Sequence, residues 1–345
     1  MRFPSEVYGL TPAYLVRRVL QTIPVFIGIT FMVFLIMYLT PGDPVEIMMG
    51  EGSVVSGEEI ERLRHELGLD RPMVEQYLSF VGGIFRGNFG RSIIQRASVM
   101  KLIGSRLPAT FELTIVSIII SVMIAIPIGV LSAVKKYSLL DNIGTVSALV
   151  GVSMPTFWLG LLLIIVFSVK FKLFPVTGRI TYGHGLEPIT NFLLIDAVIT
   201  GNWAALADVI RHLLLPAITL GCHMVALTMR ITRSSMLEVL SQDYIRTAWS
   251  KGLGRKAVIL KHALRNALVP TVTVVTLNIG VLLGGNMIVE SVFGWPGLGR
   301  LVINAIYTRD YPLVQGAVLV YAFTYVVMNF IADLLYTVLN PKVRF

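Results

Sequence analysis

The sequence predicts an all-α integral membrane protein with six transmembrane helices and a small helical module after the first of them. Composition is the first observation: the 345 residues are 55% hydrophobic and only 14% charged, whereas a soluble domain carries roughly 25% charged residues. The second observation is that the apolar residues gather in stretches of membrane-spanning length. The third is that Lys and Arg residues cluster beside the ends of these stretches, as they do in membrane proteins.

Six apolar stretches are long enough to cross a membrane, because a spanning helix needs about 20 predominantly apolar residues. They are Val19–Leu39, Leu113–Val134, Ile143–Val169, Leu213–Ile231, Val269–Val289 and Leu313–Leu335. Phe192–Ile199 is also apolar but too short to span, so we expect it to lie at the membrane interface or to pack against the protein.

The basic residues predict which ends of the six helices face the cytoplasm. Segments 1–18, 135–142, 230–268 and 336–345 together hold 15 Lys and Arg residues against 4 Asp and Glu residues. Because short positively charged loops stay in the cytoplasm, these segments and both termini are predicted to be cytoplasmic. Arg230 and Arg233 follow the fourth stretch, and we expect their side chains to extend to lipid headgroups.

The polar segment after the first stretch is predicted to form a water-exposed helical module on the extracytoplasmic side. A first helix is indicated by Ser56 and Glu59 at the spacing of a helix N-terminus, and Gly68 offers a stop. A second helix is predicted after Pro72, with apolar residues at helical spacing. These apolar residues are Val74, Tyr77, Leu78 and Val81.

No enzyme motif is present in the sequence. It contains no GxxxxGK[ST] phosphate loop, no HExxH or CxxC metal motif and no GxSxG nucleophile turn. We therefore predict no catalytic residue, no metal site and no cofactor bound by this chain. The net charge of +9 comes from residues beside the apolar stretches and not from one basic face with aromatic residues, so we expect no nucleic-acid partner.

An ion-coupled secondary carrier is the alternative from a different class. Such carriers place acidic residues or broken helices near the middle of the membrane, whereas Glu112, Glu290 and Asp333 lie near the ends of the predicted helices. Asn278 and Asn286 could nevertheless contribute to a polar path, so the residues alone leave a carrier open.

The stretch DYIRTAWSKGLGRKAVILKHALRNALVP, from Asp243 to Pro270, carries six Lys or Arg residues between two apolar stretches. It divides into a helix over Asp243–Lys251, a break at Gly252–Gly254 and a basic amphipathic helix over Arg255–Leu268. A basic amphipathic helix can lie on anionic lipid headgroups. The small and mixed side chains of the first helix equally suit docking into a groove of another protein. The sequence pattern alone does not decide between lipid contact and protein docking.

This stretch resembles the cytoplasmic EAA loop of permeases of ABC importers, and in particular the peptide and nickel branch. Ala248, Gly252 and Leu264 match the general pattern, and the departures are those of that branch. Other segments are also similar to landmarks of the branch, among them VRRVLQTIPVFIGITFMVFLIMYLTPGDP, RLPATFEL, SMPTFWLGLLL, FGWPGLGRL and DLLYTVLNPKVR. The resemblance is greatest to the B-type permeases of dipeptide and oligopeptide importers.

The resemblance implies a type I ABC importer permease fold in the cytoplasmic (inner) membrane of a bacterium or archaeon. Residues 1–106 would form the first span and the outer module, 107–338 the permease core with its EAA loop at 241–270, and 339–345 a cytoplasmic tail. The implied partners are a second homologous permease, two ATPase subunits that hold ATP and Mg²⁺, an extracytoplasmic substrate-binding protein and membrane lipid. Glutathione, nickel chelates and oligosaccharides are alternative substrates within the same branch.

The resemblance also implies that the EAA loop carries a coupling helix that docks in a groove of an ATPase subunit. The residues expected to make or support this contact are Asp243, Tyr244, Ile245, Arg246, Thr247, Ala248, Lys251, Gly252 and Leu253. Arg255–Arg265 is expected to anchor the contact. Gly252 would supply a backbone turn that larger residues would strain.

Further candidates come from the third to fifth stretches, which surround the pathway in permeases of this family. The candidates are Ser153, Pro155, Phe157, Trp158, Asn278 and Asn286. Pro155 interrupts the third stretch, either as a kink covered by neighbouring helices, which we favour, or as a hinge or cavity wall. Phe293, Trp295 and Pro296 belong to an outer loop predicted to cap or re-enter the pathway, with Trp295 at the membrane interface.

Overall fold

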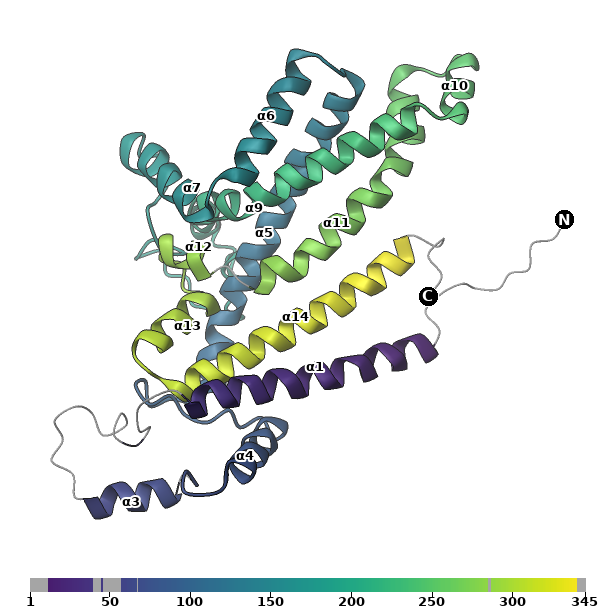
Figure 1. Cartoon of the computed structure of the whole chain (residues 1–345). Coiled ribbons are helices and arrows are strands. Elements are labelled where there is room, and N and C mark those ends of the chain that lie inside the picture. Colours follow the sequence, from purple (N-terminus) through teal and green to yellow (C-terminus); the bar gives the residue numbers. More distant parts are fainter. Residues whose placement is uncertain (1–11, 40–44, 46–56, 67, 285–286, 340–345) are drawn as a thin grey trace.

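A computed structural model describes residues 12–39, 45, 57–66, 68–284 and 287–339, and this part of the chain is predominantly helical (Figure 1). The α-helices are α1 (Pro12–Leu39), α3 (Gly57–Glu66), α4 (Met73–Phe85), α5 (Val99–Val134), α6 (Leu139–Ser153), α7 (Thr156–Leu163), α8 (Leu193–Ile199), α9 (Trp203–Leu240), α10 (Asp243–Ser250), α11 (Leu264–Gly284), α12 (Met287–Val292), α13 (Leu298–Tyr307) and α14 (Tyr311–Leu339). Two π-helical segments, η1 (Ile164–Lys170) and η2 (Ala257–Ala263), continue α7 and precede α11.

The described residues of the six predicted stretches are helical except at Met154 and Pro155. Within the described residues, five helical segments are long and apolar enough to cross a membrane: Leu20–Leu39, Val99–Val134, Trp203–Leu240, Ala257–Ile279 and Tyr311–Ile331. The third stretch is divided between α6 and α7–η1, which are bent by 110°, and counts as a sixth span only if the bent pair is one span. The prediction of an all-α membrane protein is therefore confirmed, with one span broken.

Small residues allow α5 and α9 to pack closely along their lengths. A Cβ atom on Gly221 would lie 2.4 Å from Ser121 Oγ, and one on Gly129 would lie 2.8 Å from Thr232 Cβ. Ser121 Oγ donates a hydrogen bond to the carbonyl of Gly221 at 3.0 Å. Close backbone approach at small residues and hydrogen bonds between helices are the usual means of helix association in lipid.

Glu112 and Glu290, two carboxylates near the ends of the predicted spans, are buried within the chain. Glu112 on α5 is 4% exposed, forms an ion pair with Arg179 and accepts a hydrogen bond from the backbone of Leu194 at 2.7 Å. Glu290 on α12 is fully buried and accepts a hydrogen bond from Thr110 Oγ1 at 2.7 Å. These carboxylates join the loops to the spans, since their partners come from three other segments of the chain.

Arg233 does not extend to headgroups as predicted. Its guanidinium forms two hydrogen bonds with Asp141 of α6, from Nε to Oδ1 at 2.5 Å and from Nη2 to Oδ2 at 2.7 Å. Asp141 also accepts a hydrogen bond from the backbone of Tyr137 at 2.9 Å. The prediction was wrong because the buried Asp141 carboxylate accepts both hydrogen bonds of the guanidinium within the protein. Arg230 is exposed.

The helical module after α1 consists of α3 and α4. Gly68 follows α3 with a φ of +67°, so the predicted stop is confirmed. Ser56 lies outside the described residues. α3 carries mainly charged residues, whereas α4 packs against α1 through Tyr77 and Phe80. The predicted domain division at 106/107 falls inside α5, which runs through it without a break.

α8 combines the two predictions made for its apolar stretch. Asp196 and Ala197 are fully buried, while Ile195, Val198 and Ile199 are exposed. The Asp196 carboxylate accepts hydrogen bonds from the backbone and hydroxyl groups of the preceding loop. One face of α8 is therefore packed against the protein, and the other remains an apolar surface.

Candidate functional site

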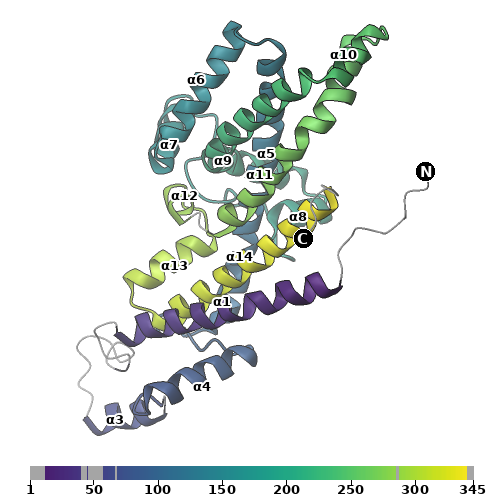
Figure 2. The same cartoon turned by 45° about the vertical axis from the view of Figure 1, so that its right-hand side comes forward.

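α10 lies at one tip of the molecule, at the opposite end from α3 and α4 (Figures 1 and 2). It follows the long helix α9 after only Ser241 and Gln242, and the chain returns through η2 into α11. The expected break between the two helical parts is present, because residues 251–254 are not helical and helical structure resumes at Arg255. Pro270 lies inside α11, and η2 and α11 form one continuous helical segment.

One face of α10 is anchored in a small apolar core. Ile245 is fully buried and Ala248 is 7% exposed. They pack with residues of α5, α9, η2 and α11, namely Val130, Ala133, Met236, Val258, Ala263 and Ala267. Ile245 and Ala248 were predicted to make or support the contact, and their buried side chains hold α10 on the bundle.

The opposite face of α10 and the turn after it are exposed. The exposed residues that were predicted for the contact are Asp243, Tyr244, Arg246, Thr247, Lys251, Gly252 and Leu253. Trp249, which is 44% exposed, shares this surface and was missed. The helical pattern alone would not have identified it, because Trp249 lies four residues after the buried Ile245 and so stands beside the buried face of α10.

Hydrogen bonds fix the helix and its turn. The side-chain amide of Asn266 on α11 donates to the hydroxyl of Tyr244 at 2.8 Å. Gly252 has a φ of +74° and its backbone N–H donates to the carbonyl of Trp249 at 2.9 Å. No atom lies within 4 Å of a Cβ built at Gly252, so its requirement is conformational and not steric. α10 is thus held at both ends while its outer face stays free of intrachain contacts that would cover it.

The break in the third span forms the wall of an open cavity. Met154 has a ψ of 130° because the residue before a proline avoids the helical region, and Pro155 starts a new helix. A cavity of about 540 Å³ opens at this point. It is lined by Leu149, Val150, Ser153, Met154, Pro155, Phe157 and Trp158.

Four of the six predicted pathway residues line this cavity: Ser153, Pro155, Phe157 and Trp158. Phe157 and Trp158 are 47% and 44% exposed, so no helix of the described chain covers the kink, and the choice between a covered kink and a hinge or cavity wall stays a prediction. Asn278 does not line it, and its side-chain amide donates to the carbonyl of Val274 in its own helix at 2.8 Å. Asn286 lies outside the described residues.

The outer loop places its aromatic residues in the core. Trp295 is fully buried, and its indole Nε1 donates to the carbonyl of Ala109 at 2.9 Å. Phe293 is 2% exposed, and Pro296 is half-buried. The expected position of Trp295 at the membrane interface is wrong, because the Arg179 guanidinium stacks over its ring and α5 binds its N–H. That the loop caps a pathway stays a prediction.

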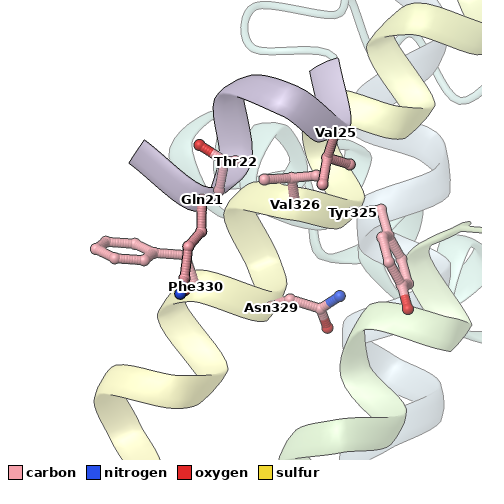
Figure 3. Close-up of a pocket in the computed structure, with 7 residues that line it drawn as sticks. All are labelled: Gln21, Thr22, Val25, Tyr325, Val326, Asn329 and Phe330. Atoms are coloured by element: carbon pink, nitrogen blue, oxygen red, sulfur yellow. The ribbon is translucent and has the colours of Figure 1, made fainter. Parts of the chain in front are cut away.

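A second groove lies between α1 and α14, away from the predicted residues. It has a volume of about 270 Å³ and is lined by Gln21, Thr22, Val25, Tyr325, Val326, Asn329 and Phe330. Figure 3 shows that the first three come from one helix and the other four from its neighbour. None of the residues predicted for the pathway lines this groove.

Comparison with known proteins identifies the family. Residues 125–345 match the binding-protein-dependent transport system inner membrane component, and residues 12–114 match the N-terminal part of the same kind of membrane component. The chain belongs to this family of binding-protein-dependent transport system inner membrane components. The description of the family agrees with the apolar helices of the fold and places its members in the inner membrane.

Individual relatives match along almost the whole chain. The chain is 46% identical to the dipeptide transport system permease protein DppB of Escherichia coli K12, over 96% of this chain and 98% of that protein. It is 44% identical to the di/tripeptide transport system permease protein DppB of Pseudomonas aeruginosa, over 96% and 98%. It is 41% identical to the oligopeptide transport system permease protein AppB of Bacillus subtilis, over 96% and 99%.

Proposed function

We propose that this chain is the membrane-spanning permease subunit of an ATP-driven importer of dipeptides and oligopeptides. The observation that carries the proposal is the 46% identity, over 96% of the chain, with a dipeptide transport permease. Glutathione, nickel chelates and oligosaccharides are the alternative substrates of such a complex. The chain itself is not an enzyme in this account, because ATP and Mg²⁺ belong to the ATPase subunits.

The partners in the proposed complex are a second homologous permease, two ATPase subunits and an extracytoplasmic substrate-binding protein. The family description supports the last of these, since its members are components of binding-protein-dependent systems. The basic segments support an orientation with both termini and α10 in the cytoplasm, where ATPase subunits would bind.

α10 is proposed to transmit the motion of the ATPase. Its anchoring by Ile245 and Ala248, and its hydrogen bond from Asn266 to Tyr244, support a rigid connection to α5, α9 and α11. A displacement of the exposed face that includes Thr247 and Trp249 would then move the long helices, because packed elements move as units. Access to the cavity beside Pro155 would switch between the two sides of the membrane as these helices tilt.

The cavity beside Pro155 is proposed as part of the wall of the pathway. Its lining is apolar and aromatic with one hydroxyl, at Ser153. Such a wall makes few directional contacts, which suits substrates that share a peptide backbone but vary in side chains. Selectivity would then rest mainly on the binding protein.

Uptake by the reconstituted complex tests this proposal. We expect a labelled dipeptide to accumulate in proteoliposomes only with ATP, Mg²⁺ and the binding protein, and to be unaffected when ionophores collapse ion gradients. Uptake that needs no ATP and stops with the ionophores would instead establish the ion-coupled carrier. Replacing the dipeptide by glutathione, a nickel chelate or an oligosaccharide distinguishes the alternative substrates.

A further inference from the structure

α4 carries three different faces around its axis. Met73, Tyr77, Phe80 and Ile84 recur at spacings of four, three and four residues and form one apolar face. Val74, Leu78, Val81 and Phe85 repeat the same spacing on the adjacent face, which is also apolar. Glu75, Gln76 and Ser79 make up the remaining polar face. The apolar surface is therefore too broad to be covered by a single neighbouring helix.

The first apolar face packs against α1. The hydroxyl groups of Tyr77 and Thr30 lie 3.0 Å apart, and the Tyr77 hydroxyl also donates to the carbonyl of Ile27 at 3.4 Å. The rings of Tyr77 and Phe80 contact Phe34, with centroids 5.5 and 6.0 Å from its ring. These contacts fix the position of α4 along α1.

The contacts fall inside the membrane-spanning part of α1. That part runs from Leu20 to Leu39. With a rise of about 1.5 Å per residue, Phe34 lies about 8 Å and Ile27 about 18 Å from Leu39 along the helix axis. Half of the hydrocarbon thickness is about 15 Å. The contacts therefore run from about 8 Å to about 18 Å from Leu39, which is from within this half of the hydrocarbon layer to just past its middle, and not beyond the membrane.

The second apolar face has no protein neighbour in the described chain. Val74, Leu78 and Phe85 are 67%, 62% and 87% exposed. The surface continues onto α1, where Ile27 and Phe31 are 57% and 44% exposed. α4 and α1 thus share one apolar surface at the depth of the acyl chains.

The charged residues around α4 are placed at its ends and on its polar side. Arg71 precedes the helix and Arg86 follows it, and both are exposed. Long cationic side chains at such positions reach headgroup phosphates while the helix lies deeper. The neighbouring helix α3 differs, because its exposed residues include Glu58, Glu59 and Glu61, which favour water.

From this geometry we infer that α4 is inserted in the membrane leaflet at the Leu39 end of α1, with Val74, Leu78 and Phe85 in contact with lipid acyl chains. α3 then lies in water beside it. The water-exposed module expected from the sequence is in this account a water-exposed helix joined to a membrane-inserted one. The occupant of the open apolar face is lipid, because the face is continuous with the lipid-exposed surface of α1.

Quenching of a fluorescent probe by agents in the lipid and in the water tests the inference. The native thiol is removed by the substitution Cys222→Ala. Single cysteines are then introduced in the full chain as Val74→Cys, Leu78→Cys and Phe85→Cys. Each variant is reconstituted with its partner subunits in phosphatidylcholine vesicles. Each is labelled with a small bimane probe. Ser79→Cys on the polar face of α4 and Glu59→Cys on α3 are matched controls, since all five positions are exposed.

We expect brominated acyl chains to quench the probes at positions 74, 78 and 85 several-fold more strongly than those at 79 and 59. Iodide in the buffer should give the reverse order. Strong iodide quenching at 74 and 78 would place this face in water and overturn the inference. Weak quenching by both agents would also overturn it, because a protein partner would then cover the face. Three positions on this face are labelled so that the test still decides if one variant fails to insert into the membrane.

Discussion

Arg233 of α9 holds Asp141 of α6 through two parallel hydrogen bonds, 2.5 and 2.7 Å long, close to the end of α9 that leads into α10. Asp141 is 2% exposed and stands at the start of the helix that ends at the Pro155 break. The pair therefore connects the proposed coupling helix, through α9, to the helix that borders the cavity. A two-point pair also fixes the relative orientation of the two helices.

Breaking this pair should loosen α6 from α9. Arg233→Lys keeps the charge but loses the second hydrogen bond, and Asp141→Asn loses the charge. We expect each to lower the free energy of unfolding by about 2 kcal/mol, and to reduce transport more than ATP hydrolysis. Thermal unfolding of the purified complex measures the first effect. If the double variant were as destabilised as the two single effects added together, the two residues would not interact.

The turn after α10 should depend on glycine at one position only. Gly252→Ala must adopt a φ near +74°, which costs a non-glycine residue about 1 kcal/mol or more. We expect weaker binding of the ATPase subunits and slower transport. Gly254→Ala is the control, because Gly254 has no positive φ and no atom within 4 Å of a Cβ. Equal effects of the two substitutions in a pull-down would contradict a conformational role for Gly252.

Two substitutions in α10 should separate folding from docking. Ile245→Ala removes a fully buried side chain and is expected to destabilise the chain by about 2–4 kcal/mol. Trp249→Ala removes an exposed side chain, so the melting temperature should stay unchanged while the affinity for the ATPase subunits falls. Surface binding measurements with the solubilised complex would check both. A Trp249→Ala variant with full affinity would exclude this residue from the contact.

The loop between α12 and α13 should not tolerate even a methyl group at position 297. A Cβ on Gly297 would lie 2.2 Å from Glu290 Oε1, and the buried carboxylate is held by Thr110 and by the backbone of Arg300. We expect Gly297→Ala to lower the melting temperature and the yield of folded protein. Gly104→Ala on α5, where a Cβ meets no atom, should be neutral or slightly stabilising. Similar melting temperatures for the two variants would refute the close contact.

The features that the sequence predicted correctly are local ones. Spans follow from runs of about 20 apolar residues, and the turn at Gly252 follows from its spacing between two helical patterns. The proline break could be located at Pro155, but the 110° bend and the exposure of Trp158 depend on which helices lie nearby. The family resemblance implied the coupling role proposed for α10, which the sequence pattern alone had left undecided.

The misplaced residues have partners far away in the sequence. Trp295 was predicted to lie at the membrane interface, but its indole N–H donates a hydrogen bond to the carbonyl of Ala109. Arg233 was predicted to extend to headgroups, but its guanidinium binds the carboxylate of Asp141. Ile245 and Ala248 lie in a motif associated with docking, yet their side chains pack on α5, α9 and α11. Hydropathy and charge do not encode such pairings, because each depends on the packing of separate helices.

Native mass spectrometry of the complex, purified under mild conditions through a tag on this chain, tests the central claim most directly. The account predicts a mass equal to this chain plus one different permease and two ATPase subunits. ATP-dependent peptide uptake by the same preparation should follow. A stable single chain or a homodimer that brings no ATPase with it would contradict the account and favour a self-sufficient carrier.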